Sequence, residues 1–306
     1  MKKILLTFAG LIAFLSFSGQ VIHHSKILDA IDRAWSQDTI VERSPYFTID
    51  DLFRMKTVAE AEISPDNKFI AFTVNVPRPF HHQAGGDYRE LYVYDLTNGH
   101  NQPFLTGSGS IFSIGWMPDG SAVTFRANLP KAQRVQVYAM DIKGGEAYPL
   151  TQHGNSVRQY AFGDRNTLFF TAEENEDETR RAFRNKGFDV EIYEEEFRHL
   201  NLYVLDLNTN ETRQLTSDVT VFDFTVSPDA AKIAAAIAPR NLVDDSYMFK
   251  DIYLVDVKNA SAELLIEIPG KLGRMAWSPE GKHLAFTAAS HVHDAVAGSL
   301  FVIDIN

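Results

Sequence analysis

A short unit that occurs five times constrains the fold of this chain more than any other sequence feature. Its clearest copy is Met275 to Phe286, in which the turn Ser278-Pro-Glu-Gly281 separates two apolar runs. The proline presets φ at the first central turn position, and Gly281 accommodates the left-handed conformation that closes a hairpin. A third apolar run follows, from Ser299 to Ile305. We therefore expect each copy to form two hairpin-linked strands and then a third strand.

The other four copies follow the same order along the chain. Three of them contain a Ser-Pro-Asp or Met-Pro-Asp turn, and the third copy of the five is degenerate. These copies begin at Ala61, Phe112, Tyr160 and Phe222. An aspartate ends every third strand and marks the register: Asp95, Asp141, Asp206, Asp256 and Asp304. A fourth strand is expected after each third strand except the last.

The spacing of these aspartates indicates the architecture. Successive gaps are 46, 65, 50 and 48 residues, and units of roughly 40–50 residues with four strands each are typical of β-propeller blades. The predicted fold class is all-β: a β-propeller of four-stranded blades, with about five blades present and an incomplete ring. Unrelated hairpins in another all-β protein are the alternative, but they do not explain five copies in one order.

The N-terminus has the pattern of a secretory signal peptide. Lys2 and Lys3 precede an apolar run from Ile4 to Phe17, which is short for a membrane span. An uncleaved anchor is the alternative. We expect a periplasmic or secreted protein that has no membrane attachment after cleavage. The predicted division is a signal peptide at 1–18, an N-terminal segment with short helices at 19–58, and propeller blades at 59–306.

Composition excludes several kinds of partner. The formal net charge of −11 argues against nucleic-acid binding, and the absence of cysteine excludes disulfides and thiolate ligands. Histidines cluster in three places, at His23-His24, His81-His82 and His291-Val-His293, without carboxylates at the spacing of a metal site. Solvated histidines are favoured over metal ligands, and no metal or other cofactor is predicted.

The longest loop of the chain is the insertion Glu173 to His199. Strands of a blade alternate in direction, so loops between second and third strands share one rim, where binding residues are expected. In the first half of the insertion we expect a helix with Asn175 as N-cap, Glu178 at N3 and Gly187 as C′. The acidic run 173–178 fits this helix start better than a calcium loop. The expected helical ion pairs are Glu176–Arg180 and Asp177–Arg181.

Three stretches carry a resemblance to a known family. They are 47–72, the proline turns followed by sequences such as Leu91-Tyr-Val-Tyr-Asp95, and Gly187 to His199. They resemble the N-terminal propeller of prolyl oligopeptidase family serine peptidases, in the dipeptidyl-peptidase and acylaminoacyl-peptidase branch. The resemblance implies a propeller that filters and positions peptide substrates for a catalytic α/β-hydrolase domain.

The sequence contains no nucleophile of that family. There is no Gly-x-Ser-x-Gly elbow, so no catalytic residue is predicted and the chain alone is expected to be inactive. We expect it to be an N-terminal part of a longer peptidase. The alternative is a stand-alone periplasmic propeller that binds partners, resembling that of the Tol system. The 40 residues at 19–58 are too few for the α/β domain that precedes the Tol propeller.

One acidic triplet is the candidate substrate site. In dipeptidyl-peptidase relatives, paired glutamates from a propeller insertion hold the substrate's free ammonium, and the resemblance implies this role for Glu194, Glu195 and Glu196. Two carboxylates in a partly enclosed cavity bind an ammonium well. A solvated acidic surface, with Arg184 and Arg198 as the neutralising cations, is the alternative.

Overall fold

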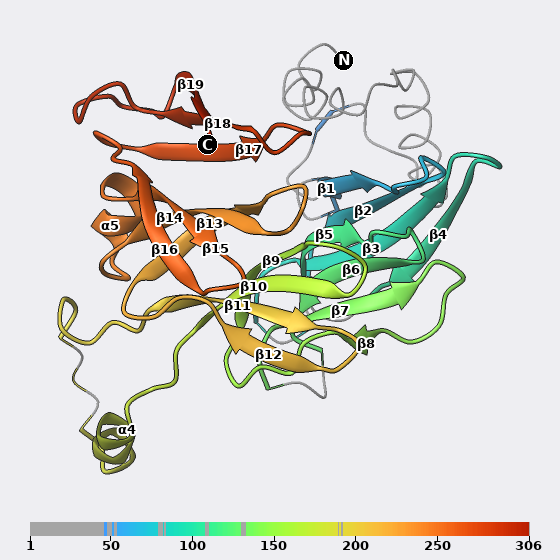
Figure 1. The fold of residues 1–306 in the computed structure, drawn as a ribbon. Coiled ribbons are helices and arrows are strands. Elements are labelled where there is room, and N and C mark those ends of the chain that lie inside the picture. The colour runs from blue at the N-terminus through green and yellow to red at the C-terminus, as the bar shows by residue number, and fades with distance from the viewer. Residues whose placement is uncertain are drawn as a thin grey trace.

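The described part of the chain is built almost entirely of antiparallel sheets. The computed structural model describes residues 46–47, 51, 54–78, 82, 84–107, 110–129, 133–188, 190 and 192–305. These residues contain five sheets that follow one another around an arc (Figure 1). The predicted signal peptide, the helical pattern from Ile27 to Trp35 and most of the helix expected from Thr48 lie outside the described residues.

Each sheet is one blade, with its strands in sequence order. Blade 1 contains β1 (Thr57–Ile63), β2 (Phe69–Val76), β3 (Tyr88–Asp95) and β4 (His100–Leu105). Blade 2 contains β5 (Ile111–Trp116), β6 (Ala122–Ala127), β7 (Gln136–Asp141) and β8 (Tyr148–Pro149). Blade 3 contains β9 (Val157–Phe162), β10 (Thr167–Glu173), β11 (Leu200–Asp206) and β12 (Glu211–Gln214).

Blade 4 contains β13 (Thr220–Val226), β14 (Lys232–Ala238), β15 (Asp251–Asp256) and β16 (Ser261–Ile266). Blade 5 contains β17 (Leu272–Trp277), β18 (His283–Ala288) and β19 (Ser299–Asp304). Two helices, α4 (Glu178–Asn185) and α5 (Val243–Met248), lie in the loops between second and third strands. The predicted fold class is confirmed: the chain is all-β, with five propeller blades, of which the fifth has three strands within the described residues.

The proline turns form as the sequence predicts. Gly281 has φ +70°, and the residue at the same turn position has φ +58° in blade 1 (Asn67) and +72° in blade 2 (Gly120). The turn serine closes the hairpin: Ser227 Oγ accepts from the Lys232 amide at 3.0 Å and donates to Asp229 at 2.6 Å. Side-chain hydrogen bonds of this kind favour a turn over a helix or a strand at the same residues. The turn is therefore specified by its local sequence.

The aspartates at the ends of the third strands organise the next turn. Asp206 Oδ1 accepts from the amides of Asn208 at 2.8 Å and Thr209 at 3.2 Å. The corresponding carboxylates make the same kind of bond to the amides of Thr97, Lys143 and Asn259. Asp95, Asp141, Asp206 and Asp256 therefore have a structural role in the turn after the third strand.

Four of the five hydrophobic clusters in the described residues lie between two successive blades, and the fifth lies within blade 1. Leu91 and Val93 of blade 1 pack with Trp116 and Phe125 of blade 2 in one buried cluster. Equivalent clusters join blades 2 and 3, blades 3 and 4, and blades 4 and 5. No helix within the described residues is long and apolar enough to cross a membrane.

Candidate functional site

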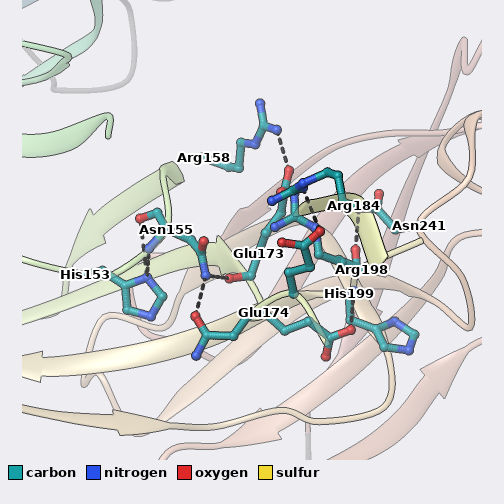
Figure 2. A network of polar contacts seen from close by, with 11 residues as sticks. His153, Asn155, Arg158, Glu173, Glu174, Arg184, Arg198, His199 and Asn241 are labelled. Atoms are coloured by element: carbon teal, nitrogen blue, oxygen red, sulfur yellow. Dashed lines mark hydrogen bonds and ion pairs between the residues drawn. The ribbon is translucent and has the colours of Figure 1, made fainter. Parts of the chain in front are cut away.

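The rim that carries the insertion is organised around Glu173, the last residue of β10 (Figure 2). Its Oε1 accepts from Arg158 Nη2 at 2.5 Å, and its Oε2 accepts from Arg198 Nη2 at 2.5 Å. Arg158 lies in the first strand of the blade, and Arg198 lies at the end of the insertion. Charge-assisted bonds of this kind are stronger than neutral ones, so one carboxylate holds both arginines at the base of the insertion.

The two ends of the insertion are also joined through the backbone. The Glu174 amide donates to the His199 carbonyl at 2.9 Å, and the His199 amide donates to Glu174 Oε1 at 3.0 Å. Asn241 Nδ2, from the corresponding loop of blade 4, donates to the Arg198 carbonyl at 2.7 Å. These bonds give the insertion a defined base between blades 3 and 4, and the residues that make them are labelled in Figure 2.

The blade 2 to blade 3 link supports Glu173 from the other side. Asn155 Nδ2 donates to the Glu173 carbonyl and to Asn175 Oδ1, both at 3.0 Å. The Asn155 amide donates to His153 Nδ1 at 3.2 Å (Figure 2). Burial lowers the pKa of His153, so its neutral ring is favoured, and this form can accept the hydrogen bond.

A pocket of about 420 Å³ opens beside this network, between blades 2 and 3. This volume lies within the range of roughly 300–1,000 Å³ that is usual for small-ligand sites. The charged lining consists of four arginines and one glutamate: Arg126, Arg134, Arg158, Arg198 and Glu173. The remaining lining is Phe112, Val135, Asn155, Ser156 and Val157. The arrangement is therefore suited to an anionic ligand.

Arg126 is the most enclosed of these arginines. Its Nε donates to Ser113 Oγ at 3.2 Å, and its Nη1 donates to the carbonyls of Val157, at 3.0 Å, and Arg158. Burial lowers the pKa of Arg126, while the negative charge of Glu60 raises it. An arginine stays protonated in proteins, so the pocket keeps a positive charge that is partly removed from water.

The helix of the insertion differs from the prediction in its N-cap. Asp177 caps α4, because its Oδ1 accepts from the Arg180 amide at 3.0 Å. Asn175 was the expected cap, but its side-chain oxygen is used by Asn155. The helix thus begins at Glu178, which makes that residue N1 and not N3. Gly187, with φ +89°, occupies the predicted position beyond the C-cap Lys186.

The later start also makes the predicted ion pairs of the helix wrong. Glu176 and Asp177 precede the helix, so neither lies on its face. Glu176 instead pairs with Arg184 at 2.6 Å and Arg181 at 3.6 Å. The expected cations of the acidic triplet, Arg184 and Arg198, are therefore bound to Glu176 and Glu173.

The acidic triplet lies in a turn after α4, outside the pocket. Glu194 and Glu195 are exposed. Glu196 Oε2 accepts from Arg180 Nη2 at 2.5 Å and from the Ile192 amide at 2.7 Å. The hydrogen bond from Arg180 is the main cause that lowers the pKa of Glu196. Glu196 is thus neutralised within the protein, and ammonium binding by Glu194 and Glu195 stays a prediction.

The pocket lies on the rim that the sequence indicated, but the sequence did not predict the pocket itself. Four charged residues of the pocket lie at or near strand ends on this rim: Arg126 near the end of β6, Arg134 before β7, Arg158 near the start of β9 and Glu173 at the end of β10. A search for charges at strand ends would have found them. Among the described residues, which include His291 and His293 but not His23, His24 or His81, no group of three or more His, Cys, Asp or Glu side chains is arranged to hold a metal.

Five blades, four interfaces and an elaborated rim define the chain as a β-propeller. It is similar to the propeller of the Pyrococcus horikoshii acylaminoacyl peptidase, with a TM-score of 0.56 and 13% identity over 79% of this chain and 37% of that one. It is also similar to a structure from Agrobacterium tumefaciens named as a TolB, with a TM-score of 0.51 and 14% identity over 81% of this chain and 82% of that one. These likenesses show the fold.

The chain also has a relative that is similar in sequence. The chain is 25% identical over 104 residues to YuxL, an uncharacterised peptidase of Bacillus subtilis (strain 168). That match covers 34% of this chain and 15% of the relative. No family model matches the chain. The predicted resemblance to the propeller of prolyl oligopeptidase family peptidases is confirmed for the fold.

Proposed function

We propose that this chain is the substrate-gating propeller of a secreted serine peptidase of the dipeptidyl or acylaminoacyl type. The observation that carries the proposal is the likeness to a peptidase in sequence as well as in fold. Chain segments of the rim are well placed to act as a filter, because α4 and its flanking turns stand away from the sheets (Figure 1). The propeller admits and orients peptides, and an α/β-hydrolase domain in the longer protein cleaves them.

A second function has its own support. The likeness to the TolB structure covers most of both chains, which favours a stand-alone periplasmic propeller that binds protein partners. In this alternative the same rim is a docking surface and no nucleophile is associated with it.

Labelling in the source cells separates the two. An extract is treated with a fluorophosphonate probe, which reacts with activated serines, and an antibody against the propeller then isolates its product. The peptidase proposal expects a labelled product longer than 306 residues, and labelling is abolished by prior heat denaturation. An unlabelled product that co-purifies with envelope proteins would contradict the proposal and support the binding module.

A further inference from the structure

The pocket between blades 2 and 3 has more positive charge than its own carboxylates neutralise. Among the described residues, four arginines line it and Glu173 is its one acid. Glu60 also acts on Arg126, but its Oε1 is bound to Arg89 at 2.9 Å and its Oε2 to the Ile114 amide at 2.9 Å. Arg158 and Arg126 repel one another. An anion inside the pocket would relieve this repulsion.

Several hydrogen-bond donors in the pocket have no acceptor among the described residues. Arg126 uses Nε and Nη1, which leaves both N–H groups of Nη2. Arg158 and Arg198 each give one N–H to Glu173. Within the part of the chain that the structure describes, Arg134 has no acceptor at all. A guanidinium carries five N–H donors, so enough remain to surround a second carboxylate.

The pocket also offers an apolar wall. Phe112 lines it, and the guanidinium carbon of Arg89 lies over that ring, 5.3 Å from its centroid. Val135 and the buried Val157 extend the apolar surface. A ligand that combines a carboxylate with a short apolar stem fits this division into a cationic part and an apolar part.

We propose that this pocket binds a carboxylate carried by a peptide, either the C-terminal carboxylate or the side chain of an aspartate or glutamate. Glu173 shows the geometry, since each of its oxygens already takes one N–H from a separate arginine. The carboxylate assignment depends on the pocket alone, and the statement that a peptide carries it rests on the proposed function. The pocket thereby favours peptides that carry a carboxylate, and this selection is separate from recognition of the N-terminal ammonium.

Pairs of acidic and neutral ligands test the proposal. The protein is purified from its source cells at its natural full length. One pair is N-acetyl-Ala-Ala with a free or an amidated C-terminus, and the other is N-acetyl-Ala-Glu-amide with N-acetyl-Ala-Gln-amide. Calorimetric titration at low salt is expected to show at least one acid binding about 10-fold or more tighter than its neutral partner. The pair that shows the difference identifies the source of the carboxylate. Raising the salt concentration weakens the binding.

Two variants and a matched control assign the effect to the pocket. Arg134→Gln and Arg158→Gln are each expected to reduce the affinity about 10-fold. Arg165→Gln is the control, because Arg165 is exposed, pairs with Asp119 at 3.2 Å and lies in the β9–β10 turn outside the pocket. Unchanged thermal melting shows that each variant is folded.

The outcomes are distinct. Equal binding of acids and amides, an equal loss in Arg165→Gln, or tighter binding of inorganic phosphate than of either acid would overturn the carboxylate site. Acid binding that is lost in the two pocket variants supports it. If fluorophosphonate labelling fails while acid binding persists, the peptidase proposal falls and the carboxylate site stands.

Discussion

The indole nitrogen of Trp277 donates a hydrogen bond of 3.0 Å to the backbone carbonyl of Thr225 in the preceding blade. Trp116 makes the same bond, of 3.2 Å, to the carbonyl of Glu62. Each tryptophan is the last residue of the first strand of its blade. In the degenerate third copy this position holds Phe162, whose side chain has no N–H group. Two of the four blade junctions are therefore joined by an indole bond as well as by apolar packing.

Replacing the indole tests that junction. Trp116→Phe keeps an aromatic ring but removes the donor, so the Glu62 carbonyl loses its partner. We expect the free energy of unfolding to fall by about 1–2 kcal/mol, the usual size for a lost hydrogen bond and an unpaired group. Urea denaturation measures it. Tyr148→Phe, at an exposed position, is expected to leave the midpoint unchanged, and equal effects of the two substitutions would refute the assignment.

The aspartate that ends β11 gives a second prediction. Asp206→Ala removes the acceptor for the amides of Asn208 and Thr209, and is expected to lower stability by about 1 kcal/mol, as for a lost cap. Asp206→Asn retains a side-chain oxygen and is expected to lose less. In the complete protein, substrate affinity stays unchanged for both. A large rise in KM at unchanged stability would show that this residue contacts substrate.

The serine–aspartate turns predict how stability changes with pH. Hydrogen bonds from Ser64 and Ser227 are the main causes that lower the pKa of Asp66 and Asp229 below their usual value near 3.8. A carboxylate with a depressed folded-state pKa stabilises the protein above its unfolded-state pKa, and this contribution is lost as pH falls through the folded value. We expect melting temperature to decline below about pH 4.

Asparagine substitution tests whether the turn aspartates cause this loss of stability in acid. Asp229→Asn should flatten the acid side of the stability profile, because the group no longer titrates. Asp87→Asn is the control, since Asp87 is exposed and has no hydrogen bond to any described residue. A profile that both substitutions alter to the same extent would show that general charge repulsion, and not the turn, determines acid stability.

The acidic triplet gives a prediction that depends on the proposed peptidase. Glu195→Gln is expected to lower kcat/KM by about 10-fold for a chromogenic dipeptide with a free amine, through loss of a charge-assisted hydrogen bond. The acetylated substrate carries no ammonium and should be unaffected. Glu196→Gln is the matched control, because the Glu196 carboxylate is held by Arg180. This substitution should change kcat/KM to the same extent for both substrates. Equal losses with Glu195→Gln on both substrates would remove the role in amine binding.

The repeated unit could be predicted because its determinants are local. A serine, a proline, an aspartate and a residue with positive φ lie within a few positions of one another, and each acts on its own turn. The helix N-cap was missed for the opposite reason. Asn175 has the right residue type, but Asn155, twenty positions earlier and on another link, uses its oxygen.

The pocket could not be assembled from the sequence for the same kind of reason. Arg126 and Arg198 are far apart in the chain, and they meet because blade 3 stacks on blade 2 and because the insertion returns to its own base. Neither the packing of these two blades nor the return of the insertion is encoded by a recognisable sequence motif. What could be predicted was the rim, since alternating strand direction places all such loops at one end of the blades.

The cores that join successive blades also determine how the molecule yields to force. Each sheet shares its buried side chains with its neighbours in sequence, as in arrays whose stability is a sum of unit and nearest-neighbour terms. A pull on the two ends of the described segment therefore acts on the sheets in series. Extension should proceed as separate rips of one blade each, and not as a single cooperative event.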